Sequence, residues 1–424
     1  MTKKRRIKII PEPKFIEDCP GDFDITKNLT IGYLCDVSQK KECKRITEYL
    51  CQALRSDKTH VKMRQKNSHP ERGKRSLFVS IRQANKPFSF EECLSIKKRV
   101  AHRQGYILYV NEKSIICKAS TCEGLFNAVQ TVIQLINSSL NTIPCARIND
   151  WPDIEKRCAH IDLSVLAPNL HAIKQLIHVF SCFKINTVFV TYADKFRFIK
   201  YPEISHVDAF SKDEVFQITA FAKDRYVDVI PVIQSFGHSS NVLVNNKYSH
   251  LREGDNNITQ FCPQHPGTLE YFKHLTEEVM EVHDSKYFHI GADETYFLGT
   301  CKQCSQVVKR KGKIGLYIDY VAKACEFVKS KGQIPMIWDD MLCQSPADIN
   351  RLDTKVIICY WDYFPSDEKN PFVFFRNDGW YCDMKYWRKK KCWTGDFINS
   401  GRCKDISDLE KKKFKHYKSY FSET

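Results

Sequence analysis

Two adjacent carboxylates, Asp293 and Glu294, are the side chains of this 424-residue sequence whose types and spacing best suit chemistry. One carboxyl group can protonate a leaving oxygen while the other stabilises positive charge at a sugar carbon, which is the division of labour that glycoside hydrolysis requires. An Asp-Glu pair taken alone is usually a solvated turn. Here an apolar run from Tyr287 to Ile290 leads through Gly291 into the pair, which predicts a buried strand ending at the two carboxylates.

Short apolar strands alternate with amphipathic helices from residue 150 onward, and this rhythm predicts a parallel (β/α) barrel. The strands are expected at residues 158–163, 187–190, 227–233, 288–291, 335–338, 356–360 and 381–386. Polar and aromatic residues collect where these strands end, at Asp162, His238, Asp293, Glu294, Trp338, Asp339 and Trp361. Because barrels build their active sites at the carboxyl ends of the strands, we expect these side chains to converge.

A small α+β domain is predicted before the barrel. Its clearest part is a hairpin over residues 105–119, followed by a helix in which Ser120 and Glu123 have capping-box spacing. A linker containing Pro144 leads from this domain to the barrel. The predicted organisation is a basic tail at 1–25, the α+β domain at 26–145 and the barrel at 150–424.

The segment from His289 to Glu294 resembles the signature of family 20 glycoside hydrolases, the β-N-acetylhexosaminidases. Residues 157–164 resemble the first barrel strand of that family, and 229–238 resemble the third. Residues 296–299, 337–342 and 359–363 resemble the hexosaminidase D branch, and the hairpin and helix at 105–136 resemble the small domain that precedes the barrel in many members. Several separated motifs in the right order are stronger evidence than any one of them.

The resemblance implies an α/β fold with a (β/α)8-type TIM barrel and an exo-acting enzyme that removes terminal, non-reducing N-acetylhexosamine with retention. In that mechanism the acetamido oxygen of the substrate attacks the anomeric carbon, so the enzyme supplies no nucleophile and needs no cofactor. Asp293 would orient the acetamido group. Glu294 would protonate the leaving oxygen and then activate water.

The resemblance also implies a set of sugar-binding residues. Arg157 would grip the hydroxyls of the terminal sugar through its donor fork. Trp338 and Trp361 would wall the acetamido pocket, and Tyr363 would donate to the acetamido oxygen. The remaining predicted substrate-binding residues, at the ends of the third and fifth strands, are His238 and Asp339.

Each supporting residue has a structural alternative. Arg157 could be a surface ion-pair partner, and Trp338 and Trp361 could be ordinary barrel packing. His238 and His289 suit a hydrogen-bonded scaffold around the site better than a role as proton carriers, and neither has the spacing of a metal site.

The 19 cysteines are scattered without a small-domain framework, which favours reduced thiols over a disulfide set. Cys301 and Cys304 have zinc-ligand spacing, but a closed site needs a second pair, which Cys382, Cys392 or Cys403 could supply. We therefore predict no metal site and keep structural zinc as the alternative.

A formal charge of +16 would suit contact with nucleic acid, but no nucleic-acid-binding motif accompanies it, so we favour a solvated basic surface and expect no such partner. Apolar runs are too interrupted to span a membrane. The basic opening lacks a full apolar signal segment, which predicts a cytoplasmic chain, with the nucleus as an alternative. Glycosylation tripeptides at Asn28, Asn137 and Asn257 would matter if a leader precedes the given start and the protein is secreted or lysosomal.

The last part of the barrel departs from the pattern of the family. Eight strands are expected, yet residues 387–424 are basic and mostly polar, and only 393–398 offer a further strand. An incomplete barrel at the C-terminal end would expose strand edges and part of the pocket. A catalytically inactive sugar-binding relative is therefore the second hypothesis, and a basic nucleic-acid-binding protein is the third. The sequence leaves open the preference for glucosamine or galactosamine sugars, the natural glycan and the oligomeric state.

Overall fold

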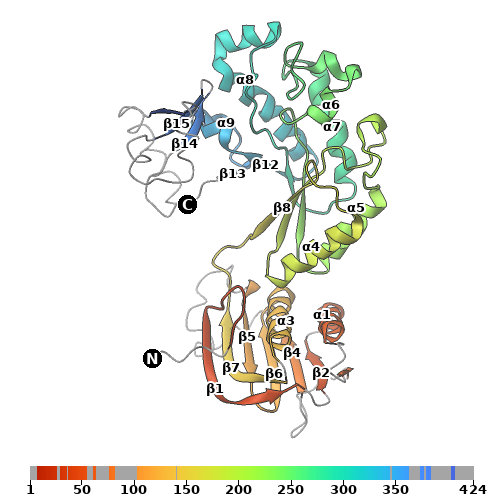
Figure 1. Cartoon of the computed structure of the whole chain (residues 1–424), viewed down its shortest axis with the longest axis vertical. Helices are drawn as coiled ribbons and strands as arrows, with labels where there is room; N and C mark the ends of the chain where they lie inside the picture. The colour runs from red at the N-terminus through yellow and green to blue at the C-terminus, as the bar shows by residue number, and fades with distance from the viewer. Residues whose placement is uncertain are drawn as a thin grey trace. The chain divides into compact units, whose positions relative to one another are not determined.

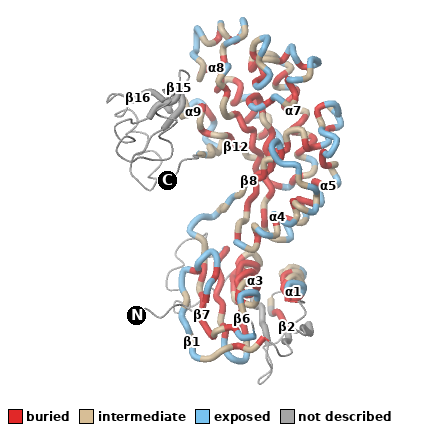
Figure 2. Tube along the Cα trace, viewed as in Figure 1, coloured by how far each residue is buried: buried red, intermediate tan, exposed pale blue. Residues whose placement is uncertain are grey.

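The computed structural model divides the chain into two compact units, Met1–Val232 with Glu278–Ser285, and Ile233–Glu277 with Lys286–Thr424. In both units the buried residues follow the strands and the helix faces that pack on them (Figures 1 and 2). No helix within the described residues is long and apolar enough to cross a bilayer. The structure describes residues 7–25, 29–35, 37–54, 61–63, 76–81, 103–139, 141–343, 346–361, 373–376, 379–382 and 403–405.

A seven-stranded sheet with helices on one face opens the first unit (Figure 1). The predicted hairpin is present, because its two strands pair antiparallel across a turn in which the Asn111 side chain accepts hydrogen bonds from the backbone of Lys113 and Ser114. In sheet order the strands are β1 (Phe15–Asp24), β7 (Thr142–Asp150), β5 (Tyr106–Val110), β6 (Ser114–Ala119), β4 (Ser76–Ile81), β2 (Leu29–Leu34) and β3 (Val61–Met63). The helices that pack on it are α1 (Lys40–Ala53) and α3 (Cys122–Asn137).

Two strands of this sheet lie where the sequence predicted a tail and a linker. β1 and β7 pair antiparallel, and Pro144 lies opposite Asp22, where the register shifts between Asp18 and Asp22. A ladder tolerates proline at such an irregularity, which is why Pro144 does not end the strand. The burial of β1 does not alternate, so no period-2 pattern revealed it. We propose that the small domain extends outward to include both strands.

Helix α3 begins one residue later than predicted. Thr121 is the N-cap, and its hydroxyl accepts a hydrogen bond from the Gly124 backbone at 3.1 Å. The predicted capping box of Ser120 and Glu123 is therefore wrong, although the apolar face of the helix is buried as expected.

A parallel sheet carries the barrel motifs, and it confirms the first six predicted barrel strands to within one or two residues. β9 is buried along its whole length, as expected for a parallel strand covered on both faces. The strands, in sheet order, are β8 (Cys158–Asp162), β9 (Thr187–Thr191), β10 (Asp228–Val232), β11 (Tyr287–His289), β12 (Ile334–Trp338) and β13 (Ile357–Cys359). The helices between or after them are α4 (Leu170–Cys182), α5 (Lys212–Lys223), α6 (Ser240–Leu243), α7 (Pro266–Met280), α8 (Lys302–Ser330) and α9 (Asp340–Cys343).

The predicted strand at 381–386 does not join that sheet. Residues 381 and 382 belong to β15 (Gly379–Cys382), which pairs antiparallel with β14 (Val373–Arg376) and parallel with β16 (Cys403–Asp405) in a separate three-stranded sheet. An apolar aromatic run satisfies a local hairpin as well as a barrel strand, and the pattern alone does not choose between them. Residues 383–386 and the candidate strand at 393–398 lie outside the described residues.

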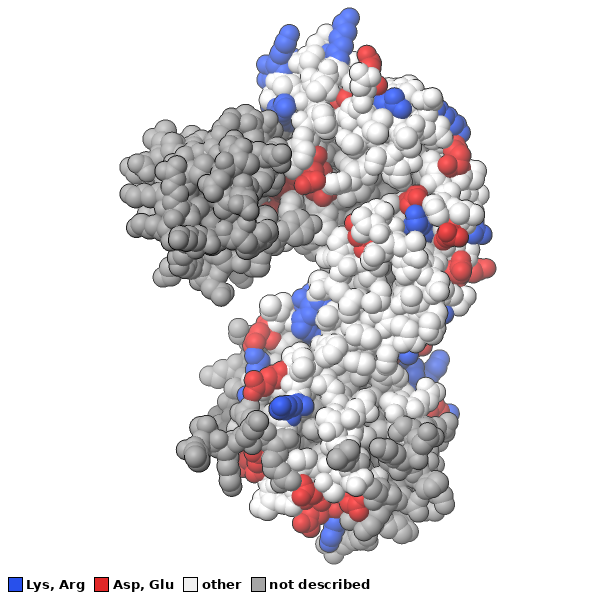
Figure 3. All heavy atoms as spheres, in the orientation of Figure 1, with Lys and Arg blue, Asp and Glu red and all other residues white. Residues whose placement is uncertain are grey.

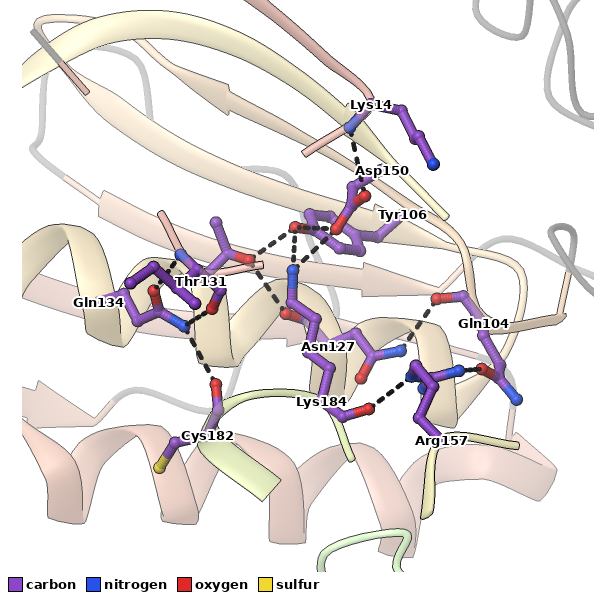
Figure 4. Close-up of polar contacts among 11 residues, drawn as sticks. Lys14, Gln104, Tyr106, Asn127, Thr131, Gln134, Asp150, Arg157, Cys182 and Lys184 are labelled. Carbon is purple, nitrogen blue, oxygen red and sulfur yellow. Dashed lines mark hydrogen bonds and ion pairs between the residues drawn. The ribbon is translucent and has the colours of Figure 1, made fainter. Parts of the chain in front are cut away.

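A buried ion pair connects the small sheet to the start of the barrel within the first unit (Figure 4). Lys184, between α4 and β9, donates to Asp150 of β7 at 2.7 Å and to the hydroxyl of Tyr106 at 2.9 Å. The Tyr106 hydroxyl is in turn 2.6 Å from that of Thr131 in α3. Burial lowers the pKa of Lys184, and the Asp150 carboxylate opposes that shift. The Asp150 carboxylate therefore balances the charge of Lys184 at a place that solvent does not reach.

Replacing Lys184 by Met should leave Asp150 without its cation, because only the hydrogen bond from Tyr106 would remain on that buried carboxylate oxygen. We expect the free energy of unfolding, measured by urea titration, to fall by about 3–5 kcal/mol. The matched control is Lys223→Met, which removes an exposed ion pair with Asp284 and should cost under about 1 kcal/mol. Equal losses in the two variants would contradict a structural role for the buried pair.

Candidate active site

The backbone after β11 is bent so that both carboxylates leave the end of the strand. Gly291, Ala292 and Glu294 all have positive φ, at 64°, 72° and 49°. A Cβ on Gly291 would lie 1.8 Å from the Oε1 atom of Gln234, so only glycine fits there. Non-glycine residues at positive φ cost free energy and persist only where the surroundings impose them. The strain therefore marks this turn as a candidate functional site.

His238 brings the two carboxylates together. Its Nε2 atom lies 3.1 Å from Asp293 Oδ2 and 3.3 Å from Glu294 Oε2. His238 itself has a φ of 47°, and a Cβ on the preceding Gly237 would lie 2.5 Å from the Asp293 carbonyl oxygen. The backbones of the two strained turns are therefore in direct contact, with no room for a side chain at Gly237.

The same contacts set the charges of the site. Hydrogen bonds to Asp293 and Glu294 raise the pKa of His238 to about 10, so its imidazole is protonated at neutral pH. The contact with His238 lowers the pKa of Glu294. Desolvation and the nearby Glu294 charge raise the pKa of Tyr296, which stays neutral and donates to that carboxylate.

The two carboxylates have different environments. Asp293 has a side chain 16% exposed and accepts a hydrogen bond from Gln234 Nε2 at 3.2 Å, while Gln234 Oε1 accepts from the Ala292 backbone at 3.3 Å. The Glu294 side chain is 37% exposed. One carboxylate is thus fixed and the other is accessible, which is the asymmetry that separate catalytic tasks need.

Asp340 is a site residue that the sequence analysis did not select. Its Oδ2 atom accepts a hydrogen bond from the Glu294 backbone at 2.8 Å. Burial, helped by the charges of Asp293 and Asp339, raises the pKa of Asp340 to about 7. The available signal was the doubled Asp339-Asp340 at the end of β12, of which only the first was chosen. Gln234 was likewise passed over inside the motif that ends in His238.

Asp339 has a positioning role here. It is buried, its Oδ1 accepts from the Trp361 backbone at 3.2 Å and its Oδ2 accepts from the Cys343 thiol at 3.1 Å. The Trp361 backbone is thereby tied to the residue that follows Trp338, and the Trp338 ring lies 4.3 Å from that of His289. The ends of β12 and β13 are neighbours in the sheet, and the sugar-binding roles of Trp338 and Trp361 stay predictions. Tyr363 lies outside the described residues.

Arg157 lies at the opposite end of its strand from the expected sugar site. It precedes β8, and its guanidinium donates to Gln104 Oε1 and to the Lys184 carbonyl, both at 2.8 Å (Figure 4). It also donates to the carbonyls of Ile154 and Glu155. These bonds use the Arg157 guanidinium to hold the segment before β8 against Gln104 and the Lys184 carbonyl, and we do not assign it to sugar binding.

Figure 3 shows the charges on one face of the molecule. Basic side chains gather over the outer end of α8, and elsewhere on that face acidic and basic groups are mixed. The solvated basic surface without a nucleic-acid partner stays a prediction.

The sequence matches the profile of the glycosyl hydrolase family 20 catalytic domain over residues 155–420, and that of domain 2 of the same family over residues 6–151. The chain therefore belongs to glycosyl hydrolase family 20, whose members are glycoside hydrolases. The resemblance that the separated motifs suggested is confirmed.

Curated relatives support the same assignment. The chain is 27% identical over 216 residues to Hexosaminidase D of Bos taurus, covering 49% of this chain and 62% of that protein. It is 26% identical over 220 residues to Hexosaminidase D of Homo sapiens, covering 49% of this chain and 45% of that protein. The alignments therefore span less than two thirds of either relative.

Solved structures confirm the fold. The β-N-acetylhexosaminidase of Bacteroides fragilis NCTC 9343 superimposes with a TM-score of 0.64 at 21% identity, covering 84% of this chain and 70% of that one. The exo β-N-acetylglucosaminidase of Vibrio harveyi, in complex with N-acetylglucosamine, gives 0.65 at 20% identity, covering 83% and 57%. At this identity the likeness establishes the TIM-barrel fold with its preceding domain.

Replacing His238 by Asn, which tolerates positive φ, should remove the cation shared by the two carboxylates. The folded pKa of His238 lies above the usual 6.5, so its contribution is fully present below pH of about 6.5 and is lost as the pH rises through about 10. Wild type should therefore lose stability relative to the variant as the pH rises from 6 to 10. We expect the difference in their unfolding free energies to shrink by only about 1 kcal/mol, because water screens a half-exposed ring.

The matched control is His206→Asn, in which an exposed histidine faces the single carboxylate of Asp208. This variant removes an imidazole that faces one carboxylate, and it measures how much of the change comes from losing any exposed histidine. If the difference in unfolding free energy between wild type and His238→Asn stayed constant from pH 6 to 10, the two carboxylates would not be raising the pKa of His238.

Proposed function

We propose that this protein is an exo-acting β-N-acetylhexosaminidase that hydrolyses terminal, non-reducing N-acetylhexosamine residues with retention by substrate-assisted catalysis. The observation that carries the proposal is the pair Asp293 and Glu294, adjacent in sequence, joined by His238 and held in unlike environments. Family membership supplies the class of reaction, and the names of the relatives supply the class of sugar.

In the first step the acetamido oxygen of the substrate forms a bond to the anomeric carbon as the glycosidic bond breaks. Glu294, the more accessible carboxyl group, delivers a proton to the departing oxygen. Asp293, fixed by Gln234 and His238, accepts the acetamido N–H and stabilises the positive charge of the cyclic intermediate. In the second step Glu294 removes a proton from water, and the water oxygen adds to the anomeric carbon from the face that the leaving group vacated, while the bond between that carbon and the acetamido oxygen breaks and restores the acetamido group.

His238 ties this chemistry to pH. Its positive charge keeps Glu294 ionised in the free enzyme, whereas the first step needs Glu294 protonated. We therefore propose that kcat/KM falls as the pH rises above the pKa of Glu294. The imidazolium then stabilises the carboxylate that forms when the proton is delivered.

The sugar pocket that we propose is built from the strand ends around these carboxylates. Trp338 and Trp361 are its proposed walls, since Trp338 ends β12, the Trp361 backbone is bonded to Asp339, and aromatic rings suit a sugar ring and an acetamido methyl group. Tyr363, which follows Trp361 closely, remains a proposed donor to the acetamido oxygen. The proposed partner is a glycan or glycoconjugate that ends in N-acetylhexosamine.

A reducing intracellular compartment, cytoplasmic or nuclear, is the location we propose. Support comes from the cysteines within the described residues, which are free thiols and in many cases buried. Buried free thiols are common in proteins that fold under reducing conditions.

The test of the function is release of a chromogenic leaving group from β-linked N-acetylglucosaminide and N-acetylgalactosaminide. Glu294→Gln should lower kcat by about 10²–10⁴-fold, because it removes the proton donor while keeping the shape of the side chain. The first anomer formed, followed by proton NMR, should be β. A folded wild-type protein without turnover would instead support the inactive, sugar-binding alternative.

Asp340 allows the positioning of Glu294 to be tested separately. Asp340→Asn keeps an oxygen acceptor for the Glu294 N–H and should retain kcat within about tenfold, whereas Asp340→Ala loses it and should lower kcat about 10²-fold. KM should change less than kcat in both. Equal activity of the two variants would show that this hydrogen bond does not orient the acid.

A further inference from the structure

Three cysteines and a glutamate, in a cluster separate from the catalytic carboxylates, converge in the second unit. One ligand atom from each of Glu253, Cys262, Cys301 and Cys304 lies within 4.8 Å of the others. The Cys262 sulfur is 3.6 Å from that of Cys301 and 3.5 Å from that of Cys304. Three of the four residues are buried, and Cys301 is partly so.

Glu253 has an unsatisfied carboxylate oxygen in this cluster. Its Oε1 atom accepts backbone hydrogen bonds from Gly299, Thr300 and Cys301 at 2.9, 3.0 and 3.2 Å. Its Oε2 atom is buried and receives no N–H or O–H donor from the part of the chain that the structure describes. Since the residue is 0% exposed, solvent does not reach that oxygen. A buried carboxylate oxygen of this kind calls for a cation.

The local backbone already has the form of a metal-binding knuckle. Cys301 is the N-cap of α8, and its sulfur accepts the backbone N–H of Cys304 at 3.3 Å. The N-terminus of a helix favours negative charge, such as thiolates would place there, and α8 is helical from Lys302 as far as a break at Gly312. Cys262 reaches the same point at the end of a loop in which Glu253 and Gln260 are joined by a backbone hydrogen bond.

The distances suit zinc. Tetrahedral zinc with Zn–S bonds of about 2.3 Å places its sulfurs about 3.8 Å apart, close to the separations found here, whereas a disulfide needs about 2.05 Å. Two cysteines separated by two residues are the usual half of a structural zinc site. Three thiolates favour a soft cation over Mg²⁺ or Ca²⁺, which prefer oxygen ligands.

We propose that Glu253, Cys262, Cys301 and Cys304 bind one structural Zn²⁺ ion. Binding converts three thiols to thiolates and releases three protons, and the carboxylate of Glu253 completes four ligands. The proposal takes up structural zinc, the alternative to our prediction of no metal site. Among the described residues, the cysteine that lies beside Cys301 and Cys304 is Cys262, 39 residues before Cys301.

The ion would stabilise the segments on both sides of the catalytic carboxylates. The Phe297 backbone donates to Gln260 Oε1 at 3.0 Å, just after Glu294 in the chain. The Ser239 backbone donates to the Thr259 carbonyl at 2.9 Å, just after His238. Zinc at this point would therefore join the loop of residues 251–262 to the start of α8. The same loop is hydrogen-bonded to the segments that follow Glu294 and His238. The role of the ion is structural, so zinc content does not depend on the proposed glycosidase activity.

The experiment is metal analysis of the purified full chain by mass spectrometry in buffer without chelator. We expect about one zinc per chain, retained through gel filtration. Cys262→Ala, Cys301→Ala and Cys304→Ala should each lose most of it. The matched control is Cys325→Ala, a buried cysteine in the same helix α8 but outside the cluster, which should keep it.

A second measurement avoids dependence on variants that fail to fold. An organomercurial thiol reagent added to the wild type should release zinc to a chromogenic chelator, and Co²⁺ exchanged into the site should give the intense bands of tetrahedral thiolate coordination. Wild-type protein that binds no zinc after reduction and zinc addition would overturn the proposal. A disulfide at Cys262 would also overturn the proposal. It would appear as a mass two hydrogens lower without reduction and as a Cys262 disulfide in peptide maps of protein that has been loaded with zinc.

Discussion

An imidazolium shared between two carboxylates is the interaction on which the candidate active site depends. Asp293 and Glu294 are like charges on neighbouring residues, and their convergence on one substrate is unfavourable unless a cation stands between them. His238 supplies that cation from a different strand end. Its high pKa and the low pKa of Glu294 are two descriptions of one contact. In the mechanism that we propose, Glu294 gives up its proton beside this cation, so we expect turnover to depend on pH.

The backbone is arranged to make that contact possible. Positive φ at Ala292, Glu294 and His238 turns the side chains away from the direction an extended strand would give them. Side-chain bonds from Gln234 and Asp340 hold the first of these turns. The strain is tolerated because the turns lie on the ends of buried parallel strands, where the hydrogen-bonded sheet limits relaxation.

Support for this end of the sheet extends outward from the site. The cluster of Glu253, Cys262, Cys301 and Cys304 braces the loops that follow His238 and Glu294. A separate set of contacts lies in the first unit, before β8 and β9, where hydrogen bonds of Lys184 and Arg157 join the small sheet to the start of the barrel. Each of these is a polar contact that is at least partly buried, so removing one partner lowers the free energy of unfolding.

The sequence by itself determined the family and the first six barrel strands, and it selected Asp293 and Glu294 as the candidate pair, because hydrophobic periodicity and the segment from His289 to Glu294 are local properties. Tertiary structure decided which polar residues meet. Gln234 and Asp340 reach the carboxylates, Arg157 donates to Gln104 and to the Lys184 carbonyl, and Cys262 lies beside Cys304, all through contacts between residues far apart in the chain. It also placed residues 381 and 382 in a hairpin, since a strand pattern specifies burial and not the identity of the neighbouring strand.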